Sequence, residues 1–418
     1  METQLEKKNF KSYLIFWIGQ IFSIFGSNIV FFVLITWITV TTQNPVAISF
    51  AAFSYFIPMI VISPIAGIIS DRHDRKKIII TADSLQAFST FILILFFIFN
   101  WVQYWIILIF TLIRSTCQAF HNPVVNAIIP TMVPKDKLSR INGLNFLFSS
   151  FVNIIGPMVG GFILLFFSVG QALWIDVITF LIALIPLLLI HIPSVKKHED
   201  KHKKESFSSS FKDGLKIIRT IPGLLSMMIA FTILNFLQQP QGTLMPYYIK
   251  VDNGGSVLDF SIVSTVFSIG TLIGGVITSV KKKWKHYMRT ILITYMIMSL
   301  GQILIATVPR GFIYLIAIYA PLVGLAAPVI NSLWFTMIHL KVPHDKVGRV
   351  VSIDTTLSFI AMPIGTILAG PLALFMGTAN LFIFATILII TTISLFYIFT
   401  NIRTLGIIEE EEKTEVII

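Results

Sequence analysis

Long runs of apolar residues alternate with short polar segments along the chain. A helix that crosses a membrane needs about 20 mostly apolar residues, and the pattern predicts twelve such helices. They are expected at residues 13–38, 46–69, 78–100, 102–121, 141–167, 171–191, 223–249, 258–280, 289–308, 311–338, 350–375 and 379–400. Apart from Asp259 and Arg289 at the ends of two of these ranges, the charged residues inside them are Asp83, Arg114, Asp176 and Asp354. The pattern therefore predicts an all-α membrane protein.

The composition supports this reading and excludes several other classes. Hydrophobic residues make up 55% of the chain and charged residues 12%, against about 25% charged in a typical soluble domain. Cys117 is the only cysteine, so neither a disulfide scaffold nor a cysteine-based zinc site can form. We expect no metal and no cofactor. The net charge of +11 comes from short segments between apolar runs, which favours membrane loops over a nucleic-acid surface.

The positions of the basic residues predict the orientation, because cytoplasmic loops are enriched in Lys and Arg. With a cytoplasmic amino terminus, all but three of the 31 Lys and Arg residues fall in inward loops and tails. The exceptions are Lys250, Arg310 and the embedded Arg114. We therefore expect a multi-pass protein of the cell membrane with both termini in the cytoplasm.

The two halves of the chain resemble each other at an offset of 209 residues. Residues 133–140 align with 342–349, Gly156 with Gly365 and Gly161 with Gly370. Six helices in each half keep the same orientation, so the halves are parallel repeats, a plan typical of transporters. The expected parts are a first six-helix half at 1–192, a cytoplasmic linker at 193–222, a second six-helix half at 223–402 and an acidic tail at 403–418.

The linker contains an amphipathic segment. Phe211, Leu215 and Ile218 alternate with Lys212 and Lys216, a pattern that predicts a helix on the inner membrane surface.

Three motifs carry a family resemblance. The loop after the second predicted helix reads Gly67-Ile-Ile-Ser-Asp71-Arg72-His-Asp74-Arg75-Lys-Lys. It resembles the G-x-x-x-D-R-x-x-R-K/R signature of the major facilitator superfamily. The fifth helix carries Gly156-Pro157-Met-Val-Gly160-Gly161, which is similar to that superfamily's antiporter motif, although Val152 replaces one of its glycines. Arg114-Ser-Thr-Cys-Gln118 in the fourth helix is similar to the superfamily's R-x-x-Q-G.

Residues 120–134, together with Asp74 and residues 348–350, are similar to the macrolide-efflux branch of drug:proton antiporters. This resemblance implies a monomeric, proton-coupled exporter of amphiphilic small molecules. The branch also includes siderophore exporters, so the substrate stays open. A facilitator or importer of a nutrient or lipid, and a transport-inactive sensor, are the remaining alternatives.

The resemblance assigns a gate to the loop after the second helix, formed by Gly67, Asp71, Arg72, Asp74 and Arg75. In the superfamily this loop holds the two halves together on the cytoplasmic side, and Asp71 would contact the start of the eleventh helix near Arg349. The alternative is that these charges only anchor the loop. Asp71 adds nothing to such anchoring, which favours the gate.

Arg114 lies about 12 residues into its predicted helix, near the middle of the bilayer at about 1.5 Å per residue. A charge at that depth indicates a functional site. Gln118 and His121 follow on the same helical face, which we expect to line the central cavity. A structural arginine bonded to carbonyls is the alternative, and His121 is equally well explained as a plain hydrogen-bonding residue.

A proton carrier is usually a buried acid, and three are available. Asp83 and Asp354 lie near the cytoplasmic ends of their helices, where a helix-end or gate role fits better. Asp176 lies near the outer end of the sixth helix and is the best proton candidate on that side. No acid is expected at the midplane beside Arg114, which leaves little to hold a cationic drug, so neutral, weakly basic and anionic amphiphiles stay open as substrates.

Uncharged polar residues mark the expected cavity, which the resemblance places along helices one, four, seven and ten. Pro240 and Gly242 are expected to interrupt the seventh helix beside its cluster of amides. Besides Arg114, Gln118 and His121, the candidate lining residues are Gln20, Asn28, Asn235, Gln238, Gln239 and Asn331.

The energy source follows from what the sequence lacks. The dipeptide Gly-Lys never occurs, so there is no phosphate-binding loop of the G-x-x-x-x-G-K-[ST] type. No nucleophile–base arrangement stands out either. We therefore expect a transporter that uses an ion gradient, and not an enzyme.

Overall fold

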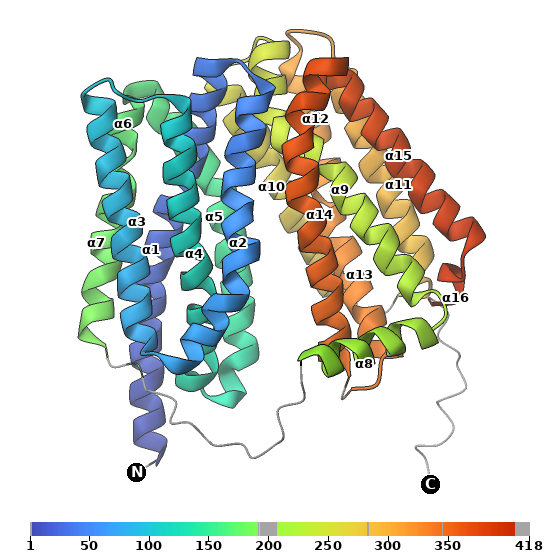
Figure 1. Ribbon diagram of the computed structural model, residues 1–418, viewed down its shortest axis with the longest axis horizontal. Helices are drawn as coiled ribbons and strands as arrows, with labels where there is room; N and C mark the ends of the chain where they lie inside the picture. Colours follow the sequence, from blue (N-terminus) through green and yellow to red (C-terminus); the bar gives the residue numbers. More distant parts are fainter. Residues whose placement is uncertain (1, 191, 193–206, 282–283, 345, 406–418) are drawn as a thin grey trace.

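The computed structural model describes residues 2–190, 192, 207–281, 284–344 and 346–405. Every regular element in this part of the chain is helical, as predicted. The helices form two bundles that stand side by side (Figure 1). Helix α8 (Phe207–Thr220) lies at one end of the molecule, which we call the α8 face, and α6 (Val169–Ala172) lies at the opposite end, the α6 face.

The first bundle contains the elements up to residue 189. They are α1 (Glu2–Thr42), α2 (Pro45–Arg72), α3 (Arg75–Ile98), α4 (Tyr104–Met132), the short η1 (Lys135–Lys137), α5 (Leu138–Phe166), α6 and α7 (Trp174–Leu189).

The second bundle follows α8. It contains α9 (Leu224–Tyr247), η2 (Tyr248–Asp252), α10 (Val257–Val280), α11 (Tyr287–Ala306), α12 (Ile313–Gly324), α13 (Ala326–Lys341), α14 (Val347–Met376), α15 (Thr378–Phe399) and α16 (Ile402–Leu405).

Ten helices in the described residues are long and apolar enough to cross a membrane, and the bent pair α8–α9 brings the number to eleven. The predicted count of twelve requires α4 as well. This helix has 29 residues but is not among the ten, because Arg114, Gln118 and His121 lower its hydropathy. This less apolar helix is one that carries candidate site residues.

One predicted detail of the spans was wrong: helix α9 continues without a break through Pro240 and Gly242 and ends only at Tyr247. The tenth predicted span is confirmed as one span, Ile313–Lys341. It has a one-residue interruption, where α12 ends at Gly324 and α13 begins at Ala326. Two helices approach too closely there for a side chain: a Cβ on Gly324 would lie 2.1 Å from the carbonyl oxygen of Phe267 on α10. Small residues at such crossings are typical of membrane helices.

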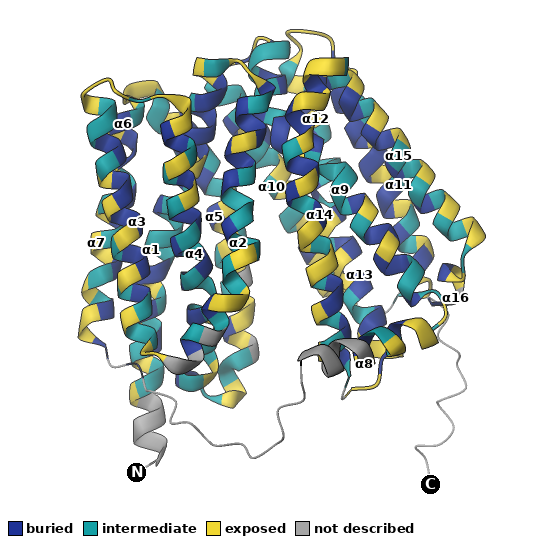
Figure 2. Ribbon diagram, viewed as in Figure 1, coloured by how far each residue is buried: buried dark blue, intermediate teal, exposed yellow. Residues whose placement is uncertain are grey.

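The exposed surface of the helices is strongly apolar. Leu189, Phe375 and Phe399 are 81%, 87% and 77% exposed, and exposed positions recur along the outward sides of the helices (Figure 2). A water-soluble protein rarely leaves so much apolar surface in contact with solvent, whereas lipid chains cover such a surface at no cost. The protein is thus a multi-pass membrane protein.

The bundles touch each other in the halves of their helices nearest the α6 face (Figure 1). Ser261 Oγ on α10 donates a hydrogen bond to the carbonyl oxygen of Pro157 on α5 at 2.7 Å. A Cβ on Gly370 of α14 would lie 2.6 Å from the carbonyl oxygen of Pro45 on α2. From there the bundles diverge toward the α8 face, so this conformation is closed at the α6 face.

Helix α8 packs on the second bundle instead of presenting its whole apolar face to a membrane surface. Ile218 is fully buried in the second bundle's core, and a Cβ on Gly214 would lie 2.7 Å from Ile353 Cδ1 of α14. Arg349 Nη1 donates to Asp213 Oδ2 at 3.2 Å. The amphipathic helix was predicted correctly, but its partner is protein for at least Ile218. The side chains of Phe211 and Lys212 lie outside the described residues.

Candidate functional site: a buried charge network and four cavities

Arg114 and Asp176 form an ion pair inside the first bundle. Arg114 Nη1 contacts Asp176 Oδ2, and Nη2 lies 3.3 Å from Oδ1. The two side chains are only 10% and 4% exposed. The prediction that no acid accompanies Arg114 was therefore wrong. Asp176 lies in the first turn of α7, and the long arginine side chain of α4 bridges the difference in depth between them.

Neighbouring hydroxyl and amide groups complete this pair. Thr90 Oγ1 donates to Asp176 Oδ2 at 2.7 Å, and Ser27 Oγ donates to Oδ1 at 3.0 Å. Gln86 Nε2 in turn donates to Ser27 Oγ at 2.6 Å. The carboxylate of Asp176 thus accepts hydrogen bonds from hydroxyl groups of α1 and α3 in addition to its contacts with Arg114 of α4. A buried ion pair needs such additional partners.

A second cluster lies one to two helical turns away, toward the α8 face. His121 Nε2 is 2.9 Å from Gln20 Oε1 and 3.5 Å from Asp83 Oδ1. Gln20 Nε2 donates to Asp83 Oδ2 at 3.4 Å. All three side chains are buried, with exposures of 4%, 3% and 8% for His121, Gln20 and Asp83. The structure therefore brings together three predicted residues: Asp83 of α3, which was a candidate proton carrier, and His121 of α4 and Gln20 of α1, which were candidate cavity residues.

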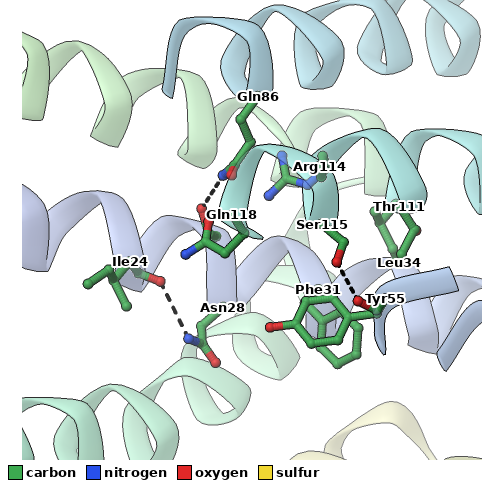
Figure 3. A pocket seen from close by; sticks show the side chains of 11 residues that line it. Ile24, Asn28, Phe31, Leu34, Tyr55, Gln86, Thr111, Arg114, Ser115 and Gln118 are labelled. Carbon is green, nitrogen blue, oxygen red and sulfur yellow. Dashed lines mark hydrogen bonds between the residues drawn. The ribbon is translucent and has the colours of Figure 1, made fainter. Parts of the chain in front are cut away.

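Four of the cavities in the described part of the chain lie beside these clusters, between the two bundles or in the second bundle. The arginine cavity, about 90 Å³, is lined by Asn28, Gln86, Arg114 and Gln118, which face one another across it (Figure 3). The histidine cavity, about 270 Å³, is lined by α1, α4 and α5 and includes Gln20 and His121.

The remaining two cavities lead from the first bundle to the second. The interbundle cavity, about 360 Å³, shares Asn28 and Phe31 with the arginine cavity. The glutamine cavity, about 300 Å³, is lined by Gln238, Gln241 and Gln302 and shares Phe260 and Phe267 with the interbundle cavity. Because neighbouring cavities share lining residues, the three cavities lie in a row. The arginine cavity at one end is lined by a charged residue, and the glutamine cavity at the other end is lined by aromatic and amide side chains.

Six of the predicted lining residues border these cavities: Gln20, Asn28, Arg114, Gln118, His121 and Gln238. The other three do not. Gln239 is used in packing, since its Oε1 accepts from Thr366 Oγ1 at 3.1 Å and its Nε2 donates to the carbonyl oxygen of Asn235. Asn331 is exposed on α13.

Sequence reasoning missed Gln86, Thr90 and Gln302, which lie on helices three and nine of the predicted count. Their polar side chains inside apolar runs were the available signal. The search was confined to the four helices that the family resemblance names, and so passed over them. Gln241 has a further feature: its buried Nε2 has no hydrogen-bond partner among the described residues, which leaves a donor without an acceptor beside the glutamine cavity.

The predicted gate loop separates into parts. Asp74 caps α3 by accepting from the backbone N–H of Lys76 at 2.9 Å. Arg75 Nη1 donates to the carbonyl oxygen of Ala127 on α4 at 2.8 Å. The side chains of Asp71 and Arg72 lie outside the described residues, so their predicted contact stays a prediction. A Cβ on Gly67 would meet nothing within 4 Å.

The antiporter-like motif lies at the contact between bundles. A Cβ on Gly160 would lie 2.8 Å from Phe32 on α1, and one on Gly161 would lie 2.5 Å from Ser261 on α10. Gly156 faces Asn28 at an ordinary 3.4 Å. The motif's small residues therefore allow α5 to approach both bundles closely, with Pro157 supplying the carbonyl that Ser261 binds.

Asp354 lies in the second bundle, away from the other acids. It is 4% exposed, and Trp334 Nε1 donates to its Oδ2 at 2.9 Å. Among the described residues there is no group of three or more His, Cys, Asp or Glu side chains that could hold a metal ion.

Two bundles of membrane-spanning helices, in contact at one face and with adjoining cavities in and between them, are the architecture of a membrane transporter. The sequence model described as Major Facilitator Superfamily matches residues 16–365 and 236–416. The chain belongs to this family, and it is a transporter and not an enzyme.

Curated relatives place it in the macrolide-efflux-like branch. Macrolide efflux protein A of Streptococcus pyogenes is 27% identical over 374 residues, which cover 90% of this chain and 92% of that protein. The staphyloferrin A transporter of Staphylococcus aureus is 27% identical over 406 residues, 93% of each chain.

Solved structures show the same fold at low sequence identity. A bacterial homologue of the iron transporter ferroportin, in an inward-facing state, has a TM-score of 0.72 at 12% identity and covers 92% of this chain and 98% of its own. A D-xylose–proton symporter has a TM-score of 0.67 at 14% identity and covers 94% of this chain and 100% of its own.

Proposed function

We propose that the protein exports amphiphilic small molecules of the macrolide type across the cell membrane in exchange for protons. The observation that carries this proposal is the similarity to macrolide efflux proteins over about nine tenths of both chains. The cavities support it, because their aromatic and amide walls suit a bulky, largely apolar molecule with a few polar groups.

In this proposal the substrate occupies the route from the arginine cavity through the interbundle cavity to the glutamine cavity. Phe31, Phe260 and Phe267 cover its apolar body. Gln241 offers a buried donor that lacks an acceptor when the site is empty, so an oxygen atom of the substrate would satisfy it. Asn28 and Gln118 supply polar contacts at the other end.

Alternating access follows from the way the bundles meet. They are in contact near the α6 face, and the distribution of basic residues assigns the α8 face to the cytoplasm. The described conformation would then receive substrate from the cytoplasm. Closure at the α8 face would bring the loop of Gly67, Asp71 and Arg72 against the start of α14. The empty space beside Gly67 leaves room for that contact.

The test is proton exchange in inverted vesicles that contain a pH-sensitive dye and have an acidic interior. Erythromycin, other amphiphilic antibiotics and staphyloferrin A are added in turn. Alkalinisation of the interior on adding one compound, absent from vesicles without the protein, is the expected result. An unchanged interior with every compound, despite folded protein in the membrane, refutes proton-coupled export.

A siderophore exporter is the second candidate, supported by the similarity to the staphyloferrin A transporter over 93% of both chains. The same panel separates the two, because a response to staphyloferrin A without a response to erythromycin selects the siderophore.

A further inference from the structure

The two buried carboxylates of the first bundle have different electrostatic partners. Asp176 is paired with Arg114, whose guanidinium is always charged. While Asp176 is ionised, the Arg114–Asp176 pair carries no net charge. Asp83 has no such partner in the described structure: the basic group that lies beside it is His121, whose ring is charged only when doubly protonated. One acid is therefore permanently compensated and the other is compensated only with a proton.

The hydrogen bonds around His121 fit a ring that gains and loses a proton. Nε2 faces Gln20 Oε1 at 2.9 Å and Asp83 Oδ1 at 3.5 Å, while Nδ1 lies 3.5 Å from Asn122 Oδ1. Asn122 Oδ1 is oriented by a bond from Gln118 Nε2 at 3.3 Å. Both ring nitrogens thus face oxygen atoms, and a charged ring, which has two donors, satisfies both sides.

The groups that face Asp83 come from three neighbouring helices. Cys117 and Arg114 belong to α4, Asp176 belongs to α7, and α1 contributes Gln20, which is not ionisable. Since Arg114 and Asp176 neutralise each other, the charge of the cluster changes with the proton on Asp83 and His121. When His121 is neutral and Asp83 is ionised, the cluster carries one negative charge. When the pair gains one proton, the cluster is neutral.

The histidine cavity gives this pair an exit. His121 and Gln20 line the cavity together with Asn122, Asn126 and Asn145, and its volume of about 270 Å³ holds several water molecules. Asp83 lies behind them and is not a lining residue. A proton that leaves the pair would therefore pass into a polar, water-sized space built by α1, α4 and α5.

We propose that Asp83 and His121, bridged by Gln20, bind the proton that the transporter exchanges for its substrate. This inference rests on the proposed proton-coupled export. The proton adds to His121 beside ionised Asp83 and leaves to water in the histidine cavity; no other bond is made or broken. We assign the proton to this pair and not to Asp176, because the basic partner of Asp176 is an arginine with a fixed charge, whereas the basic partner of Asp83 can itself gain and lose a proton.

The experiment compares two transport modes in proteoliposomes. One is accumulation of radiolabelled erythromycin driven by an imposed pH gradient. The other is exchange of labelled for unlabelled erythromycin with no gradient, which needs substrate binding and alternating access but no net proton movement. Staphyloferrin A serves as a second probe. The variants are Asp83→Asn and His121→Gln, with the exposed His286→Gln and Asp136→Asn as controls for the same chemical changes.

We expect both variants to keep the exchange rate of the wild type while their accumulation falls to the level seen without a gradient. The controls should retain both activities. Retained exchange shows that a variant is folded. Gradient-driven accumulation that survives in Asp83→Asn and His121→Gln overturns this proposal alone. Loss of exchange in both variants also overturns this proposal, because the pair would then be needed for folding or substrate binding. A wild type that exchanges but never accumulates overturns the proposed proton coupling as well.

Discussion

Replacing Asp176 with asparagine should destabilise the protein by removing the acidic partner of a buried arginine. The two side chains are 10% and 4% exposed, so water cannot replace the lost charge. Removing one member of a buried ion pair costs about 3–5 kcal/mol. Asparagine keeps an oxygen for Thr90 or Ser27, so the expected loss is about 3 kcal/mol, at the lower end of that range.

The assay is unfolding of the purified protein by SDS in mixed micelles, followed by the loss of helical circular dichroism. Arg114→Met is measured alongside, and so is the double variant Arg114→Met with Asp176→Leu. Because the double variant leaves no uncompensated charge, it should lose less than the sum of the two single losses, by about 2–3 kcal/mol. The exposed Asp136→Asn is the control for a lost surface carboxylate.

Two results would refute the reasoning. One is an Asp176→Asn variant within about 0.5 kcal/mol of the wild type, the range of an ordinary surface substitution. The other is strict additivity of the two single losses in the double variant, which would mean that Arg114 and Asp176 do not interact in the folded protein.

Four further outcomes follow from the structure. Gly161→Leu should slow transport by forcing α5 off a serine of α10, whereas Gly143→Ala, with nothing within 4 Å of its Cβ, should match the wild type in a vesicle transport assay. Lys76→Met should cost about 1–2 kcal/mol in SDS unfolding, since its Nζ donates to two carbonyl oxygens at the end of α7 at 2.8 and 2.7 Å. Gln241→Leu should raise the thermal unfolding temperature of the empty protein, because a buried unpaired donor is removed, and also raise the KM for export; an unchanged KM argues against a substrate contact. Asp71→Asn should preserve folding but reduce transport, and normal transport in that variant removes the gate from the proposal.

Much of the architecture could be predicted from the sequence. Apolar runs locate helices because a bilayer forces each spanning segment to satisfy its own backbone. The helix ends were less certain. The predicted fourth span ended at residue 121, whereas α4 continues to Met132, because polar residues that line cavities look like the end of an apolar run. Pro240 looked like a helix break, but α9 absorbs it, and the division of the tenth span depends on the approach of Gly324 to α10.

The sequence predicts which residues belong to the site but not which of them contact each other. Charges inside apolar runs identified Asp83, Arg114 and Asp176, because a buried charge is too unfavourable to occur without a reason. Which acid accompanies Arg114 depends on how α7 is displaced along its axis relative to α4, and no local pattern records that displacement. The same holds for His121 and Asp83, which are far apart in sequence and meet only through the packing of α3 on α4.

The two bundles differ in where they hold buried charge, although the sequence predicts that they are repeats of one plan. In the described residues of the first bundle, four ionisable side chains lie in two adjacent clusters inside the helices, and three helices supply the hydrogen bonds that hold them. The second bundle holds Asp354 against a tryptophan and lines its cavity with amides and aromatic rings. The pair whose charge can change lies at the histidine cavity, beside the proposed substrate route and not in its wall. In the proposed mechanism, the first bundle would therefore register the proton, while the second bundle supplies an apolar, hydrogen-bonding surface for the substrate.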